Sequence, residues 1–179
     1  MLNGKVALIT GGSRGIGKSV SIELAKAGAI VIINYANSES SAKEVLNIVE
    51  ESGGTGEILQ FNVSDTIVVE EKIKYILEKY EKIDILVNNA GITKHIDFFN
   101  IKEPDWDQIN AINAKGAFFC MQKVSKLMID QKVMGRIVNT ASIAGKGYQR
   151  SSNAAYASSK GSVIAMTHIA ASVLAKHGI

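Results

Sequence analysis

The first thirty residues combine an apolar run, a glycine-rich turn and an amphipathic stretch, and this order constrains the fold more than any other part of the chain. Residues 5–10 read K-V-A-L-I-T, a continuous apolar run typical of a strand that is buried on both faces of a parallel sheet. The turn T-G-G-S-R-G-I-G follows at once and opens a helical pattern that ends near Gly28. This unit predicts an α/β fold.

Strand and helix patterns continue to alternate along the remaining chain. The sequence shows no linker and no internal sequence repeat. We expect further strands over 29–34, 57–63, 84–88 and 136–141, and helices over 38–51, 64–82, 104–130 and 153–177. The prediction is one domain over residues 1–179 with a doubly wound, Rossmann-like parallel sheet. In such a sheet, ligands bind at the carboxyl ends of the strands, where the strand order reverses.

Composition excludes several classes of protein. The chain has 179 residues, of which 46% are hydrophobic, and this argues against disorder. No apolar run reaches the 18 or so residues of a membrane span, and no signal-peptide pattern precedes the first strand, so we expect a cytoplasmic protein without a membrane partner. The net charge of +3 is scattered, which gives no reason to expect nucleic-acid binding.

The sequence also offers little for a disulfide or a metal. A single cysteine, Cys120, excludes an internal disulfide and is expected in the core. His95, His168 and His177 are far apart and lack partners at ligand spacing, so no metal site is expected.

The glycine turn predicts a binding site for a diphosphate. Gly11, Gly15 and Gly17 let the backbone turn tightly, and the free N–H groups at the helix N-terminus attract negative charge. The alternative is a tight turn without a ligand.

The second strand favours NADP(H) over NAD(H). It ends at Asn34, followed by Tyr35, where an NAD-binding unit usually has Asp or Glu to hold the ribose hydroxyls. Without a carboxylate nothing repels a 2′-phosphate, and the Arg14 guanidinium is suited to pair with it. The alternative is that Arg14 is only a solvated turn residue.

Tyr156 and Lys160, in Y-A-S-S-K, suggest proton transfer to a carbonyl, together with Ser142 after the fifth strand. On a helix a spacing of four places both side chains on one face, about 5 to 6 Å apart at Cβ. Bringing a tyrosine pKa from about 10 to near neutral needs roughly 4 kcal/mol, which an adjacent cation in a partly dry cleft helps to supply. Such pairs also arise by chance on solvated helix faces.

Taken together, these motifs resemble those of the short-chain dehydrogenases/reductases over nearly the whole chain. The cofactor turn, N-N-A-G at 88–91, Asn113 in I-N-A-K-G, and Ser142 with Tyr156 and Lys160 occur in the family's order. The resemblance implies an NAD(P)-dependent oxidoreductase acting on CH–OH or C=O groups. The cofactor-binding residues that it implies are Gly11, Ser13, Arg14, Gly15, Ile16, Gly17, Asn34, Asn62, Val63, Asn89, Ala90, Gly91, Tyr156 and Lys160.

The resemblance also implies a role for each catalytic residue. Tyr156 is the general acid in reduction and Ser142 hydrogen-bonds the carbonyl oxygen. Lys160 lowers the pKa of Tyr156 and holds the nicotinamide ribose, while Asn113 anchors a water that links Lys160 to solvent. For Asn88 we expect a structural role that ties neighbouring strands.

Within the family, the chain is most similar to 3-oxoacyl-(acyl-carrier-protein) reductases of fatty-acid synthesis. This similarity implies NADPH as the cofactor and a 3-oxoacyl thioester as the substrate. It also implies docking of an acyl carrier protein, for which Lys132 and Arg136 are candidate contacts. A polyol or secondary-alcohol dehydrogenase and a nucleotide-binding fragment without turnover are the alternatives. The helices from Pro104 and Asn153 carry apolar residues on several faces, and relatives pair these helices into homodimers or homotetramers. The apolar residues concerned include Phe118, Phe119, Val163 and Met166.

Two departures from the family pattern stand out. The loop before Tyr156 is one residue longer than usual, within 149–153, at the border of the substrate pocket. The chain also ends where relatives continue, so the fold is expected to be truncated after the helix that follows strand five and to lack the C-terminal substrate lid. Strand five then becomes a sheet edge. We expect the sequence to be a fragment of a longer active enzyme.

Overall fold

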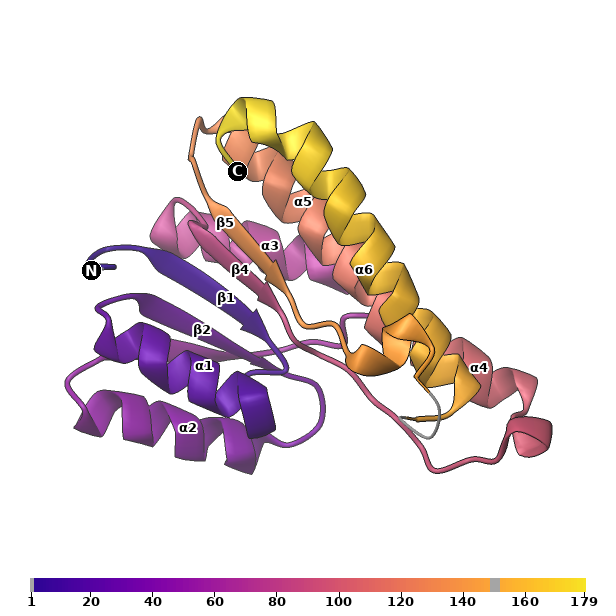
Figure 1. The fold of residues 1–179 in the computed structure, drawn as a ribbon. Coiled ribbons are helices and arrows are strands. Elements are labelled where there is room, and N and C mark those ends of the chain that lie inside the picture. Colours follow the sequence, from indigo (N-terminus) through magenta and orange to yellow (C-terminus); the bar gives the residue numbers. More distant parts are fainter. Residues whose placement is uncertain (1, 149–151) are drawn as a thin grey trace.

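The computed structural model describes residues 2–148 and 152–179, and within them five parallel strands form one sheet in the order β3-β2-β1-β4-β5 (Figure 1). The strands are β1 (Val6–Thr10), β2 (Ile30–Tyr35), β3 (Thr55–Gln60), β4 (Ile85–Asn88) and β5 (Arg136–Asn139). The chain builds outward from β1 to β3 and then returns to add β4 and β5 on the other side of β1. The strand order therefore reverses between β1 and β4, which confirms the predicted doubly wound fold.

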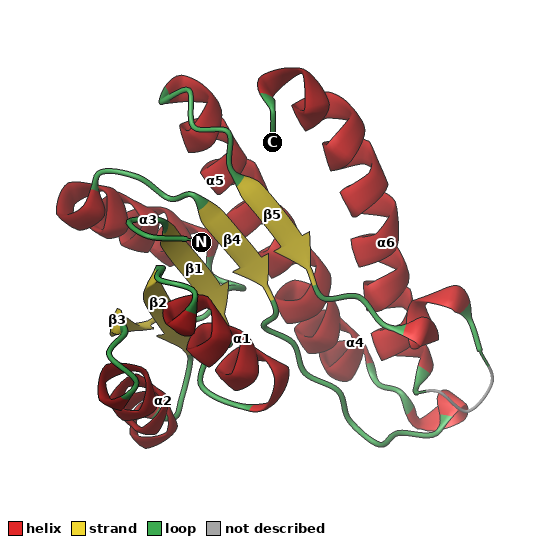
Figure 2. Ribbon diagram, turned by 60° about the vertical axis from the view of Figure 1, so that its left-hand side comes forward, coloured by secondary structure: helices red, strands yellow, loops and turns green. Residues whose placement is uncertain are grey.

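Helices cover both faces of this sheet (Figures 1 and 2). They are α1 (Gly15–Lys26), α2 (Glu39–Glu51), α3 (Thr66–Tyr80), α4 (Glu103–Asn110), α5 (Ala117–Asp130) and α6 (Ala154–Leu174). α1 and α2 pack on one face, whereas α3 and α5 pack on the other, with α6 beside α5. None of the helices within the described residues is long and apolar enough to cross a membrane.

The alternation of side chains along β1 feeds two separate cores. Val6 and Leu8 join the cluster under α3 and α5, while Ala7 and Ile9 join the cluster under α1 and α2. All five residues of β1 are buried, as expected for a central parallel strand. Each fully buried Leu or Ile contributes about 1.5–3 kcal/mol, so the two cores hold β1 from both sides.

β5 is a sheet edge, as predicted, and it is much less covered than β1. Ile137 packs against the core under α5, but Val138 points to the opposite face and is 53% exposed. Along β5, Arg136 and Val138 are exposed and the residues between and after them are half-buried. The strand that precedes Ser142 is therefore held mainly through one face.

The predicted helix over 104–130 is confirmed as one continuous helical run, but its middle is not α-helical, because a π-helical stretch, Ala111–Gly116, lies between α4 and α5. The helix passes very close to the loop that follows β3 here: a Cβ on Gly116 would lie 2.8 Å from Val63 Cγ2 and 2.9 Å from the Val63 carbonyl oxygen. Such widened turns are frequent at functional sites. This one carries Asn113, which is 1% exposed, into the protein interior.

Two further predicted boundaries shift. β3 ends at Gln60 instead of residue 63, so Asn62 and Val63 lie in the loop beyond the strand. α6 ends at Leu174 and a short 3₁₀ turn, Ala175–His177, follows it.

Candidate active site

The glycine turn between β1 and α1 is pressed against the segment that follows β4. Gly11 has φ +63°, and a Cβ there would lie 2.9 Å from Ala90 Cα. A Cβ on Gly17 would overlap the Gly11 carbonyl oxygen and lie 2.6 Å from Asn89 Nδ2. Only glycine allows this approach of strand, turn and helix. The turn thus leaves bare backbone facing the carboxyl edge of the sheet.

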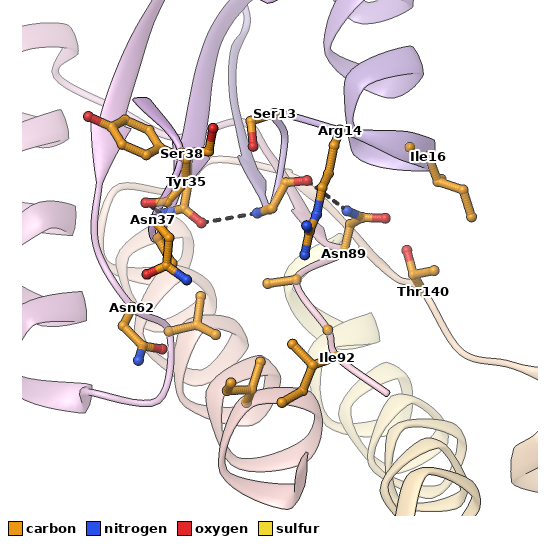
Figure 3. A pocket seen from close by; sticks show the side chains of 18 of the residues that line it. Ser13, Arg14, Ile16, Tyr35, Asn37, Ser38, Asn62, Asn89, Ile92 and Thr140 are labelled. Carbon is orange, nitrogen blue, oxygen red and sulfur yellow. Dashed lines mark hydrogen bonds between the residues drawn. The ribbon is translucent and has the colours of Figure 1, made fainter. Parts of the chain in front are cut away.

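Two asparagines hold this turn in place (Figure 3). Asn34 Oδ1 accepts a hydrogen bond from the Gly11 N–H at 3.0 Å, and Asn89 Nδ2 donates to the Gly11 carbonyl at 3.1 Å. Asn34 Nδ2 also donates to the carbonyls of Leu59 at 3.2 Å and Phe61 at 2.9 Å. Because Asn34 is 2% exposed and its amide is bonded to the backbone, its side chain anchors the turn.

A cavity of about 850 Å³ runs along the carboxyl ends of the strands, from Tyr35 and Ser38 to Tyr156 and Lys160. Of the predicted cofactor residues it is lined by Gly11, Ser13, Arg14, Gly15, Ile16, Asn34, Asn62, Val63, Asn89, Ala90, Gly91, Tyr156 and Lys160. Gly17 lies outside this lining because it is buried beneath the turn. The cavity, its glycine-lined wall and the helix N-terminus fit a dinucleotide.

Several lining residues at the end of β2 were missed by the sequence analysis. They are Ala36, Asn37, Ser38 and Ser41, in the loop after β2 and the first turn of α2. The Ser38 side chain caps α2 by accepting a hydrogen bond from the Ser41 N–H. A serine placed directly after a buried strand and before a helix is the sequence signal that points to this second helix N-terminus.

Arg14 extends from the glycine turn into the cavity (Figure 3). Its side chain is exposed, and among the described residues no carboxylate forms an ion pair with it. The described lining of the cavity contains no Asp or Glu. The guanidinium is therefore placed to meet an anion.

At the other end of the cavity, Lys160 lies beneath Tyr156 on α6. Its Nζ donates a hydrogen bond to the Thr140 carbonyl at 2.6 Å and lies 5.8 Å from the centre of the Tyr156 ring. Burial lowers the pKa of Lys160, which is only 5% exposed. Such a lysine releases its proton more readily than a solvated one.

Asn113 is close to this pair but does not line the cavity. Its Oδ1 accepts from the Ile92 N–H at 2.8 Å, while Nδ2 donates to the Ile92 carbonyl at 2.9 Å and to Ser159 Oγ at 3.0 Å. Both N–H groups of the amide are thus bonded within the protein. The side chain fixes the segment after β4 against α6.

Ser142 is half-buried and caps the short helix Ile143–Lys146, where its Oγ accepts from the Ala144 N–H at 3.2 Å. It does not line the cavity. A hydroxyl that accepts through oxygen keeps its proton for donation, so Ser142 retains the chemistry expected of it. The longer loop predicted within 149–153 falls largely on residues 149–151, outside the described part of the chain.

A second cavity of about 700 Å³ adjoins the end of the first cavity that is lined by Thr93, Tyr156 and Lys160. It shares Thr93 with the first cavity and is lined by Lys94, His95, Ile96, Asp97, Phe98, Gly147, Tyr148, Ser152, Asn153, Ala154 and Ala157. Ala154 and Ala157, which are close to Tyr156 in sequence on α6, line this second cavity, whereas Tyr156 lines the first.

Other sequence-based expectations have mixed outcomes. Asn88 ties β4 to its neighbours, since its Nδ2 donates to Asn139 Oδ1 and to the Ala117 carbonyl. Cys120 is fully buried, which raises its pKa to about 12. Arg136, a candidate docking residue, begins β5 at the opposite end of the strand from the cavities and donates to the Gly178 carbonyl. Within the described residues no group of His, Cys, Asp and Glu is arranged to hold a metal.

Comparison with known proteins agrees with this geometry. A 3-oxoacyl-[acyl-carrier-protein] reductase of Synechocystis is 41% identical over 178 residues, which cover 99% of this chain and 71% of that protein. One from Staphylococcus epidermidis is also 41% identical, over 98% of this chain and 71% of its own.

Solved structures show the same fold. NAD⁺-bound xylitol dehydrogenase matches with a TM-score of 0.92 and 34% identity, covering 99% of this chain and 68% of that one. A short-chain type dehydrogenase/reductase from Mycobacterium marinum has a TM-score of 0.94 and 32% identity, with coverages of 99% and 72%. The family model for short chain dehydrogenases matches residues 5–179. The chain therefore belongs to the short-chain dehydrogenase family and is an NAD(P)-dependent oxidoreductase.

Proposed function

We propose that the protein is an NADPH-dependent ketoreductase that reduces 3-oxoacyl thioesters to 3-hydroxyacyl thioesters. The observation that carries this proposal is the single cavity that connects Arg14 to Tyr156 and Lys160. Similarity to two proteins named 3-oxoacyl-[acyl-carrier-protein] reductase supports the choice of substrate.

The preference for NADPH rests on the end of the cavity near β2. Arg14 lines the same cavity as the residues after β2, among which Ser38 caps the N-terminus of α2. A 2′-phosphate here meets a guanidinium, serine hydroxyls and a positive helix end. No described lining residue carries a carboxylate that would repel it.

Bound NADPH supplies the hydride, and the residues of the chain handle the oxygen and its proton. Tyr156 donates its phenolic proton to the carbonyl oxygen, and Ser142 hydrogen-bonds the same oxygen. Lys160 stabilises the phenolate that remains and holds the ribose next to the nicotinamide. Gly11, Asn89 and Ala90 line the wall of the cavity that would hold the rest of the dinucleotide.

The second cavity is proposed to take the acyl thioester. Ile96 and Phe98 offer apolar surface to an acyl chain, while His95 is a basic residue suited to an acidic partner such as an acyl carrier protein; Lys94 beside it already pairs with Asp105 Oδ1 at 2.6 Å. This assignment replaces Lys132 and Arg136 as the docking candidates.

Oxidation of NADPH, followed by its absorbance, tests the proposal. With acetoacetyl thioesters as substrate, we expect turnover with NADPH to be at least about tenfold faster than with NADH. A factor of this size corresponds to the loss of one charge-assisted contact. Turnover of xylitol with NAD⁺, and none of the thioester, would instead indicate a polyol dehydrogenase.

We also propose that the protein forms a homodimer or homotetramer through α5 and α6. Exposed apolar side chains on these helices support this: Phe118 is 39%, Ile169 is 69% and Val173 is 56% exposed. Val163 is buried within the subunit and Met166 packs against its core, so these two residues are not available for pairing. Light scattering after gel filtration is expected to give at least twice the mass of one chain, and a monomer would refute the pairing.

A further inference from the structure

Tyr156 is held at its backbone N–H by the residue that begins its helix. Asn153 caps α6, and its Oδ1 accepts from the Tyr156 N–H at 2.8 Å. The other half of the same amide reaches across to the segment after β4: Nδ2 donates to the Lys94 carbonyl at 2.6 Å and approaches Thr93 Oγ1 at 3.5 Å. One side chain thus joins two parts of the chain that are 59 residues apart.

The carbonyl of Tyr156 is tied to the same segment from the other side. It accepts from Ser159 Oγ at 2.7 Å, and Ser159 Oγ accepts in turn from Asn113 Nδ2 at 3.0 Å. Asn113 completes the connection through its two hydrogen bonds with the Ile92 backbone. Ser159 and Asn113 are buried. The first turn of α6 and the segment Ile92–Lys94 are therefore closed into a ring of hydrogen bonds.

This ring forms walls of both cavities. Ile92, Thr93 and Tyr156 line the cavity assigned to the cofactor, and Thr93, Lys94 and Asn153 line the cavity assigned to the substrate. A change in the distance between α6 and the Ile92–Lys94 segment would move Tyr156 relative to both ligands. Displacements of about 1 Å are enough to cost large factors in rate.

Helix capping alone does not require asparagine at this position. Serine and aspartate cap as well, because only a side-chain acceptor is needed. The bond to the Lys94 carbonyl needs a donor in addition, which aspartate lacks and which serine carries one bond nearer the backbone, whereas the amide of asparagine provides both an acceptor and a longer donor. The choice of residue is thus explained by the connection between α6 and the Ile92–Lys94 segment as well as by the helix.

We propose that Asn153 is a positioning residue for Tyr156, which it holds in register with the Ile92–Lys94 segment. The expected effect on turnover rests on the proposed function. The structural connection between α6 and the Ile92–Lys94 segment does not depend on it. Asn153→Ser keeps a capping oxygen but replaces the amide N–H with a hydroxyl one bond nearer the backbone, and Asn153→Asp keeps the cap and removes the donor to Lys94 altogether, so the two variants together separate the two tasks of the amide.

For Asn153→Ser we expect kcat to fall about tenfold while the KM for NADPH stays within about twofold, since the contact acts on the chemical step. The matched control is Asp65→Ser at the N-cap of α3, where Asp65 accepts from the N–H groups of Ile67 and Val68, both at 3.1 Å. The control is expected to lose a similar amount of thermal stability and to keep the kcat of the wild type.

Hydrogen–deuterium exchange of the full chain gives a readout that does not depend on activity. In Asn153→Ser the amides of 92–97 should exchange faster, while those of the first turn of α6 stay protected by the retained cap. Asn153→Asp, which also caps but cannot donate, should behave in the same way and serves if the serine variant folds poorly.

The outcomes distinguish the two proposals. Unchanged exchange in 92–97 together with an unchanged kcat would overturn the role of Asn153. Faster exchange in a protein whose wild type has no ketoreductase activity would support the connection and refute the proposed function. A loss of kcat equal in Asn153→Ser and in Asp65→Ser would reduce Asn153 to an ordinary helix cap.

Discussion

The two ends of the main cavity are built in different ways. The glycine turn rests on β1 and β2, strands inside the sheet whose residues are almost all buried, and is held by Asn34 of β2 and by Asn89 after β4. The catalytic end rests on β5, an edge strand with one exposed face, and on the first turn of α6 (Figure 2). The first is supported by buried strands inside the sheet, whereas the second is supported by an edge strand and by hydrogen bonds between α6 and the segment after β4. Mutations at the two ends should therefore separate binding from turnover.

The largest expected effect is on turnover. Tyr156→Phe removes the proton donor and should lower kcat about a thousandfold, within the range for loss of a general acid. Because the cofactor end is unaltered, the Kd for NADPH should change less than threefold, as measured by quenching of protein fluorescence. A variant with nearly normal kcat would show that the proton comes from another group.

Gly17→Ala is the converse change at the cofactor end. The added methyl group would overlap the Gly11 carbonyl oxygen and crowd Asn89 Nδ2, so the turn must move. We expect NADPH affinity to fall about a hundredfold, comparable with the loss of several backbone contacts to a phosphate. Gly53→Ala is a useful control for the effect of a glycine replacement, because nothing lies within 4 Å of its added Cβ, although its φ of +79° adds strain. Equal affinities in both variants would contradict the role of the close approach.

A smaller and more selective effect is expected at Arg14. Arg14→Ala should weaken NADPH binding about tenfold, the value of one charge-assisted hydrogen bond, and leave NADH binding unchanged. Titration calorimetry with both cofactors measures the difference. If both affinities fell together, Arg14 would serve the diphosphate instead of the 2′-phosphate.

The smallest effect is expected far from the cavity, at the amino end of β4. Burial tends to raise the pKa of Asp84, but hydrogen bonds from Lys5 and the Val6 N–H and the charge of Lys82 outweigh it and lower the pKa. The contribution of Asp84 to stability is therefore complete above its unfolded pKa of about 3.9 and is lost as the pH falls through the lower folded value. Asp84→Asn should cost about 1 kcal/mol at pH 7 and progressively less in acid, as measured by urea unfolding. A cost that does not depend on pH would exclude this linkage.

Local sequence patterns predicted most residues that line the cofactor end of the cavity, and at the other end they predicted Tyr156 and Lys160, which line the same cavity, but not the contacts that hold this end together. Strand, glycine turn and helix are adjacent in the chain, so local patterns were enough to find Gly11 and Arg14. The π-helical stretch at Asn113 escaped prediction because it follows from the close passage of Gly116 over Val63, a tertiary contact. The connection between Asn153 and Lys94 depends in the same way on packing between elements distant in sequence.

The most direct test of the account is a crystal structure of the protein with NADPH. The account predicts one continuous ligand in the main cavity, with its 2′-phosphate against Arg14 and Ser38 and its nicotinamide ribose against Tyr156 and Lys160. A cofactor bound elsewhere, or a Tyr156 hydroxyl turned away from the nicotinamide, would contradict it.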